Sequence, residues 1–215
     1  MISATLHARL QNGEFGSLPA SVASFPALYL RTKLCKESDV TTRSILVTYA
    51  SRGGSTMGVA KAIATVLTEQ RLPVTLLPMQ QVKHLNSYQA VVAGSPIHKN
   101  RWLPEALAFV KEHQIGLRTK PFAAFLTCLA LAMTNQPAKT LNDVAQWLQP
   151  VRHFVQPCSE GLFAGVLDLS KISLGYRLLF RGAMTVRRWR EGDYRNWHAI
   201  EAWAATLPTK FSSIH

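Results

Sequence analysis

The sequence has 215 residues, 47% of them apolar, which is enough for one well-filled domain and a tail. Its three cysteines, Cys35, Cys128 and Cys158, are widely separated, which argues against a disulfide framework or a structural zinc site and indicates a reducing compartment. The net charge of +12 predicts attraction to an anionic partner: nucleic acid, a membrane surface or an acidic small molecule.

Residues 1–43 differ from the rest of the chain. Gly and Pro are scattered through them, and no helical or strand period is sustained. We expect a poorly ordered or loosely docked extension. The charged head and compact apolar core of a secretory signal are absent, so an untargeted tail is favoured over a targeting peptide.

From Ser44 onward, strand-like and helix-like patterns alternate. The expected strands are SILVTYA from Ser44, VTLLPM from Val74, AVVAGS from Ala90, FAAFLTCLA from Phe122 and LFAGVLD from Leu162. The expected helices are 58–70, 103–113, 139–148 and 197–207. The apolar run 121–133 is shorter than the roughly 18 residues of a membrane span, and it is interpreted as a buried strand and its exit. This alternation predicts an α/β fold, a doubly wound parallel sheet of five strands with helices on both faces.

The loop SRGGST, residues 51–56, follows the first strand and precedes the first helix. Unpaired N–H groups and the positive end of the helix dipole favour a phosphate at such a position. Gly53 and Gly54 allow the backbone to curve around an anion, and the hydroxyl groups of Ser51, Ser55 and Thr56 can donate hydrogen bonds. Neither G-x-x-x-x-G-K-[ST] nor G-x-G-x-x-G is present, so a monophosphate fits best. The alternative is an ordinary turn with a serine cap.

The motif S-x-G-G-S-T, together with AGSPIHKNRW and GDYRNWHAIEAWA further along, resembles the flavodoxin superfamily. The resemblance is to the flavodoxin-domain branch that includes menaquinone-dependent protoporphyrinogen dehydrogenase, and it extends from about Ser44 to Leu207. It implies the flavodoxin strand order 2-1-3-4-5, with the cofactor FMN at the switch point between strands. It also implies a folded domain at 44–208, a tail at 209–215 and no metal.

The resemblance implies that three loops converge on FMN. The phosphate loop would be Ser51, Arg52, Gly53, Gly54, Ser55 and Thr56, and the ring system would lie between Ser95, Pro96, Ile97 and His98 on one side and Thr127, Cys128, Leu129 and Ala130 on the other.

Some of these residues have alternative interpretations. Pro96 is also consistent with simple strand termination. Cys128 reads as a small buried residue rather than a redox thiol, because no basic residue lies near it in the sequence. His98 is either a solvated loop residue or a catalytic proton acceptor.

The third loop, TCLALAM, differs from those of acidic electron carriers. It has no aromatic residue, and no carboxylate occurs between Glu112 and Asp143. Like-charge repulsion of an anionic reduced flavin would therefore be absent from this loop. Two-electron chemistry on an accessible ring is expected rather than one-electron transfer at low potential.

Residues 171–190 form a basic insertion that contains Arg177, Arg181, Arg187 and Arg188 and no acid. Its apolar residues can share one side of a helix. Such a helix can lie on an anionic bilayer, close over an anionic flat substrate, or pack on the core with a solvated basic face. Nucleic acid is not favoured, because no recognised motif accompanies the charge.

The function implied by the resemblance is an FMN-dependent oxidoreductase that dehydrogenates protoporphyrinogen IX, or a similar anionic flat substrate, with a quinone as acceptor. The alternatives are a flavin-dependent quinone or small-molecule reductase, an electron-transfer protein, and a flavin-free membrane scaffold. A cytoplasmic location, peripheral on the inner face of the cell membrane, is expected.

Overall fold

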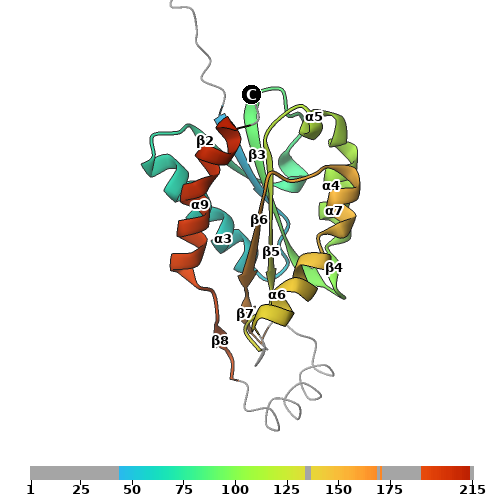
Figure 1. Ribbon diagram of the computed structural model, residues 1–215, viewed down its shortest axis with the longest axis vertical. Helices are drawn as coiled ribbons and strands as arrows, with labels where there is room; N and C mark the ends of the chain where they lie inside the picture. Colours follow the sequence, from blue (N-terminus) through green and yellow to red (C-terminus); the bar gives the residue numbers. More distant parts are fainter. Residues whose placement is uncertain (1–43, 134–136, 169, 171–189, 214–215) are drawn as a thin grey trace, which may run out of the picture. The chain divides into compact units, whose positions relative to one another are not determined.

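The computed structural model describes residues 44–133, 137–168, 170 and 190–213. The predicted extension 1–43 and the part of the predicted basic insertion from 171 to 189 lie outside these residues. Figure 1 shows a central sheet with helices on both faces.

The strands are β1 (Ser44–Tyr49), β2 (Val74–Pro78), β3 (Tyr88–His98), β4 (Arg101–Trp102), β5 (Phe122–Cys128), β6 (Ser159–Ala164), β7 (Val166–Leu167) and β8 (Gly192–Asp193). The α-helices are α3 (Ser55–Glu69), α4 (Pro104–Glu112), α5 (Gln114–Arg118), α6 (Pro137–Gln146), α7 (Gln149–Phe154) and α9 (Trp197–Ser212), and a short 3-10 helix, η2, spans Met79–Gln81.

The main sheet has the order β2-β1-β3-β5-β6, and each of these neighbouring pairs is parallel. When only the five parallel strands are numbered along the chain, this order is 2-1-3-4-5. The predicted doubly wound fold is therefore confirmed. Strand β4 is an addition, because it pairs antiparallel with β3 and forms a hairpin. Strands β7 and β8 form a separate two-stranded ribbon.

The alternation of side chains along buried strands separates two apolar layers. Ile45 and Val47 of β1 pack on the side of α3 and α9, whereas Leu46 packs on the side of α4 and α7. All residues of β5 are buried, as expected for a central strand that is covered on both faces. The core therefore occupies both faces of the sheet and leaves the carboxyl ends of the strands for a site.

Several element boundaries differ from the prediction, and the predicted strand from Leu162 is divided between β6 and β7. Strand β3 continues past Ser95 through Pro96 to His98, so Pro96 does not terminate it. Its pairing with β1 ends at Gly94, while its pairing with β5 continues to Pro96. A proline is tolerated there because one side of the strand no longer has a main-sheet neighbour. Helix α9 continues beyond Leu207 through Pro208 to Ser212, and Phe211 is buried against the core.

Candidate functional site

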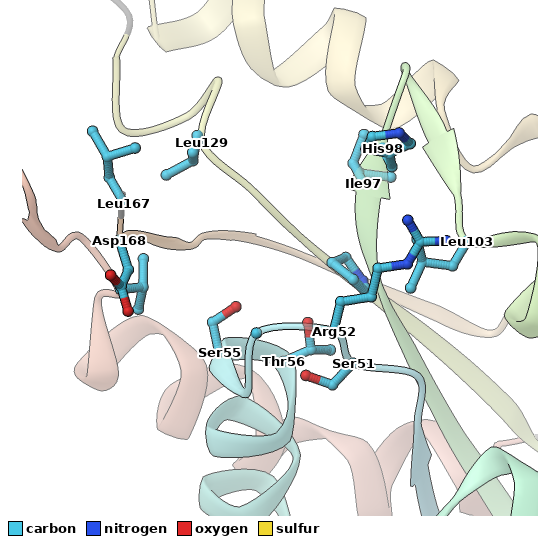
Figure 2. Close-up of a pocket in the computed structure, with 13 residues that line it drawn as sticks. Ser51, Arg52, Ser55, Thr56, Ile97, His98, Leu103, Leu129, Leu167 and Asp168 are labelled. Atoms are coloured by element: carbon cyan, nitrogen blue, oxygen red, sulfur yellow. The ribbon is translucent and has the colours of Figure 1, made fainter. Parts of the chain in front are cut away.

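A pocket of about 290 Å³ lies at the carboxyl ends of the central strands. Figure 2 shows the loop after β1 on one side, His98 on a second side, and Leu129 with Leu167 on a third. The lining residues are Ser51, Arg52, Gly53, Ser55, Thr56, Pro96, Ile97, His98, Leu103, Leu129, Val166, Leu167 and Asp168. Nine of them were predicted from the sequence, and all three predicted loops contribute.

The loop after β1 is a turn that its own side chains and backbone hold in place. The N–H of Gly54 donates to the Oγ of Ser51 at 2.9 Å. Gly54 has a φ of 84°, in the left-handed region that residues with a Cβ rarely adopt. The loop is therefore a turn closed by a serine, as the alternative to a phosphate-binding loop predicted. The same turn leads directly into helix α3.

The N-terminus of α3 faces this pocket. Among the described residues, no side chain caps the helix, and its first helical backbone bond is donated by Gly58 to Gly54. The amides of the first turn and the positive end of the helix dipole are thus directed toward the pocket. Figure 2 shows the Ser55 hydroxyl pointing into it, and the Ser51 hydroxyl still has a proton to donate. These groups form the donor set that a monophosphate needs.

Thr56 and Thr127 connect two of the predicted loops. Both side chains are buried, and their hydroxyl oxygens lie 2.8 Å apart in a hydrogen bond. Thr127 does not line the pocket, so the structure places it behind the wall, where it holds the start of α3 against the end of β5.

The second predicted loop is the β3–β4 hairpin. Lys99 and Asn100 form its turn, with φ values of 51° and 59°. Ser95 is buried and does not line the pocket. Its Oγ accepts a hydrogen bond from the N–H of Leu103 at 3.0 Å and donates to the carbonyl of Pro96. Ser95 therefore anchors the hairpin to the start of α4.

The third predicted loop contributes one residue, Leu129, to the pocket. Cys128 is buried, as predicted for a small buried residue, and desolvation raises the pKa of its thiol. Ala130 packs with the core on the α4 side. Gly54, Ser95, Thr127, Cys128 and Ala130 are thus the predicted site residues that support the pocket from behind or beside it.

Four lining residues were not predicted: Leu103, Val166, Leu167 and Asp168. The last three follow β6, whose carboxyl end lies at the same edge of the sheet as those of β1, β3 and β5. The rule that ligands bind outside the carboxyl ends of parallel strands could have identified them, had it been applied to the fifth predicted strand.

The walls of the pocket are aliphatic. No Phe, Tyr or Trp occurs among the described residues that line it. Trp102, the one aromatic candidate in the second loop, is fully buried in the core on the α4 side. Asp168 supplies a carboxylate from the loop after β7, so the predicted lack of negative charge holds for the third loop and not for the whole pocket. An accessible ring site is supported.

The predicted substrate or membrane arginines, Arg177, Arg181, Arg187 and Arg188, lie outside the described residues. Within the part of the chain that the structure describes, no cluster of His, Cys, Asp and Glu could hold a metal ion. No described helix is both long and apolar enough to cross a bilayer.

A doubly wound sheet with a phosphate-type loop and a ring-sized pocket at its switch point defines a flavin- or nucleotide-binding class of protein. The sequence model of the Flavodoxin domain family matches residues 46–192, more than half of the chain, and the chain belongs to this family. Flavodoxin domains bind FMN, so the predicted cofactor is confirmed.

Solved structures with similar folds include a flavodoxin from the domain Archaea, at 16% identity and a TM-score of 0.48, with 79% of this chain and 99% of that one covered. A short-chain flavodoxin associated with a bacterial microcompartment matches at 13% identity and a TM-score of 0.49, covering 77% and 96%. Rubredoxin:oxygen oxidoreductase of Desulfovibrio gigas matches at 17% identity and a TM-score of 0.44, covering 80% of this chain and 36% of that one. No protein with a curated description matches the sequence.

The residues present fit FMN. The uncapped start of α3 and the hydroxyl of Ser55 suit the phosphate, and the aliphatic side chains of Ile97, Leu129 and Leu167 suit the ring system.

Proposed function

We propose that the protein is an FMN-dependent oxidoreductase that dehydrogenates protoporphyrinogen IX, or a similar flat anionic substrate, and passes the electrons to a quinone. The observation that carries the proposal is the single pocket where the phosphate-type loop, the β3–β4 hairpin and the loop after β5 meet. FMN, when bound, supplies the two-electron redox chemistry.

The chain's own residues would position the cofactor and manage protons. Ser55 and the first amides of α3 would hold the phosphate, while Ile97 and Leu129 would contact the ring system and exclude water from its sides. The described lining residues include no aromatic side chain, and such a lining would leave a ring face accessible to a flat substrate.

His98 is the proposed proton acceptor for the dehydrogenation. It lines the pocket and is exposed, so its imidazole can reach both a bound substrate and solvent. A neutral ring nitrogen would accept the pyrrole proton that is released as the substrate is oxidised, and would then pass it to water.

The proposed partners are the anionic substrate, a quinone and an anionic membrane surface. The net charge of +12 and the basic composition of residues 171–190 support the membrane as the place where a quinone is reached. Nucleic acid is not proposed as a partner.

The test has two stages. Purified protein is mixed with FMN and desalted, and its absorbance spectrum is recorded; about one retained flavin per chain is expected. Anaerobic turnover of protoporphyrinogen IX is then followed with menadione as acceptor. Loss of all flavin on desalting would contradict the proposal that this protein acts with bound FMN. Retained flavin without turnover of the porphyrinogen or of any small-molecule donor would favour an electron-transfer protein.

A further inference from the structure

The β3–β4 hairpin places a group of exposed basic side chains beside the pocket. His98, Lys99 and Arg101 are all exposed, and His98 itself lines the pocket. Arg52, on the opposite loop, also lines it and has an exposed side chain. Basic side chains therefore come from both the hairpin and the loop after β1 in the described structure.

The register of the hairpin determines which way these side chains face. Ile97 pairs with Trp102, and His98 pairs with Arg101. Directly opposed residues of an antiparallel pair project from the same face, with Cβ atoms about 5 Å apart. Trp102 is fully buried, so the Ile97–Trp102 face is the inner one. Arg101 therefore projects from the same face of the hairpin as His98, which lines the pocket, although Arg101 is not itself one of the lining residues.

The hairpin is firmly anchored. Trp102 lies in the core on the α4 side, and the Ser95 hydroxyl accepts from the N–H of Leu103 at 3.0 Å. Its turn holds two residues other than glycine in the left-handed region, Lys99 and Asn100. Asparagine tolerates this conformation, but lysine adopts it at a cost. An anchored ribbon fixes the backbone positions from which these basic side chains extend before a ligand arrives.

Arg101 is also available for pairing. Among the described residues, no carboxylate lies within ion-pairing distance of its guanidinium. Arg52 has a weak partner, since its Nε lies 3.9 Å from Glu105, with both side chains substantially exposed. The acid that lines the pocket, Asp168, comes from the loop after β7 rather than from the hairpin. Among the described residues, basic side chains thus come from the hairpin and the loop after β1, and the lining carboxylate comes from the loop after β7.

We propose that Arg101 is a specificity-determining residue, which binds a carboxylate or sulfonate substituent of the substrate at the mouth of the pocket, with Lys99 adding to the positive potential. A planar guanidinium matches such oxyanions with paired N–H donors. The inference rests on the proposed function, because it assigns the anionic part of the substrate to residues next to the proposed redox site.

The test compares two ligands that differ in charge, 1,4-naphthoquinone-2-sulfonate and neutral 1,4-naphthoquinone. The Kd of each is measured by titration calorimetry on FMN-supplemented protein. The wild type should bind the sulfonate about fivefold to tenfold more tightly than the neutral quinone, the range expected for a charge-assisted pair at a partly exposed site. Arg101→Gln should lose most of this preference, and Arg101→Lys should keep a part of it.

Lys111→Gln is the matched control, because Lys111 is exposed in the last turn of α4 and its substitution also removes one positive charge. It should keep the preference. A wild type without preference, an Arg101→Gln variant that retains it, or an equal loss in Lys111→Gln would each overturn the proposal. Loss of binding to vesicles of 70% phosphatidylcholine and 30% phosphatidylglycerol in Arg101→Gln, with an unchanged sulfonate preference, would overturn it in favour of a membrane contact.

The proposed function is tested separately by reduced-flavin turnover with the same two quinones. A binding preference that depends on Arg101 without any turnover would contradict the oxidoreductase and support the anion site. Turnover of both quinones without a binding preference for the sulfonate would support the oxidoreductase and contradict the anion site.

Discussion

Gly58 and Arg195 share one small volume beside the first turn of α3: a Cβ atom at residue 58 would lie 2.3 Å from Nη1 of Arg195. That nitrogen donates to the carbonyl of Ser55 at 3.2 Å, while Nε and Nη2 bind the Asp193 carboxylate at 2.8 and 2.5 Å. The guanidinium also lies 4.2 Å from the ring centroid of Trp197. Residues distant in sequence thus hold the start of the helix that borders the pocket.

Gly58→Ala should have opposite effects in two backgrounds. Alanine is about 0.5–1 kcal/mol better than glycine inside a helix. In an Arg195→Ala background the substitution should stabilise the protein by about that amount. In the wild type the gain should be cancelled or reversed, because Arg195 must move away from Ser55. Urea unfolding of the four proteins measures the coupling, and an equal gain in both backgrounds would contradict the contact.

The Asp193–Arg195 pair predicts a pH-dependent contribution to stability. The hydrogen bonds from Arg195, together with its charge, hold the pKa of Asp193 below its ordinary value. Because the folded-state pKa is depressed, the stabilisation is fully present above the unfolded value of about 4 and is lost as pH falls through the folded value. The carboxylate is 40% exposed, so the effect should be small, under about 1 kcal/mol. The difference in unfolding free energy between wild type and Asp193→Asn should therefore be constant from pH 6 to 8 and shrink below pH 4.

The parts of the fold that could be predicted are those encoded by local pattern. The continuous apolar runs of β1 and β5 identify buried strands. The loop between β1 and α3 combines glycines with hydroxyl-bearing residues, which is typical of a phosphate-binding turn. The hairpin at Lys99 and Asn100 could not be predicted, because its turn lacks the glycine that usually marks a two-residue hairpin, and Pro96 suggests a strand end. The part played by Arg195 depends on packing between segments that are distant in the sequence, which no local pattern reports.

Thr127→Val should destabilise the protein by about 1–3 kcal/mol, because it leaves the buried Thr56 hydroxyl without its partner. Thr127→Ser keeps the hydroxyl and should cost less. The double variant Thr56→Val with Thr127→Val removes both polar groups and should be less unstable than the sum of the single changes. Additive losses in chemical denaturation would show that the two hydroxyls do not depend on each other.

His98→Ala should lower turnover of the porphyrinogen about 10²-fold if His98 is the proton acceptor, the usual scale for loss of a general base. FMN retention should be unchanged, because the proposed phosphate contacts lie on the other loop. The decisive measurement is the pH dependence of kcat/KM. A profile in His98→Ala that matches the wild type would show that the imidazole is only a solvated loop side chain.

A comparison of Gly54→Asp with Gly54→Asn isolates the effect that a negative charge at the proposed phosphate site has on FMN binding. Gly54 has a φ of 84°, so both variants carry backbone strain, and a Cβ there would meet nothing within 4 Å. Asparagine and aspartate have nearly the same shape, so the part of any effect that is due to strain is common to both. A negative side chain near a phosphate costs about 1 kcal/mol or more even in water-like surroundings. The aspartate variant should bind FMN about fivefold or more weakly than the asparagine variant.

Riboflavin, which lacks the phosphate, provides the internal control for these two variants. Its Kd should be the same in Gly54→Asp and Gly54→Asn, because only the phosphate senses the added charge. Fluorescence titration of both flavins against both variants and the wild type measures all of these constants. If aspartate and asparagine weaken FMN equally, or if riboflavin discriminates between them as strongly as FMN does, the phosphate does not bind at the start of α3.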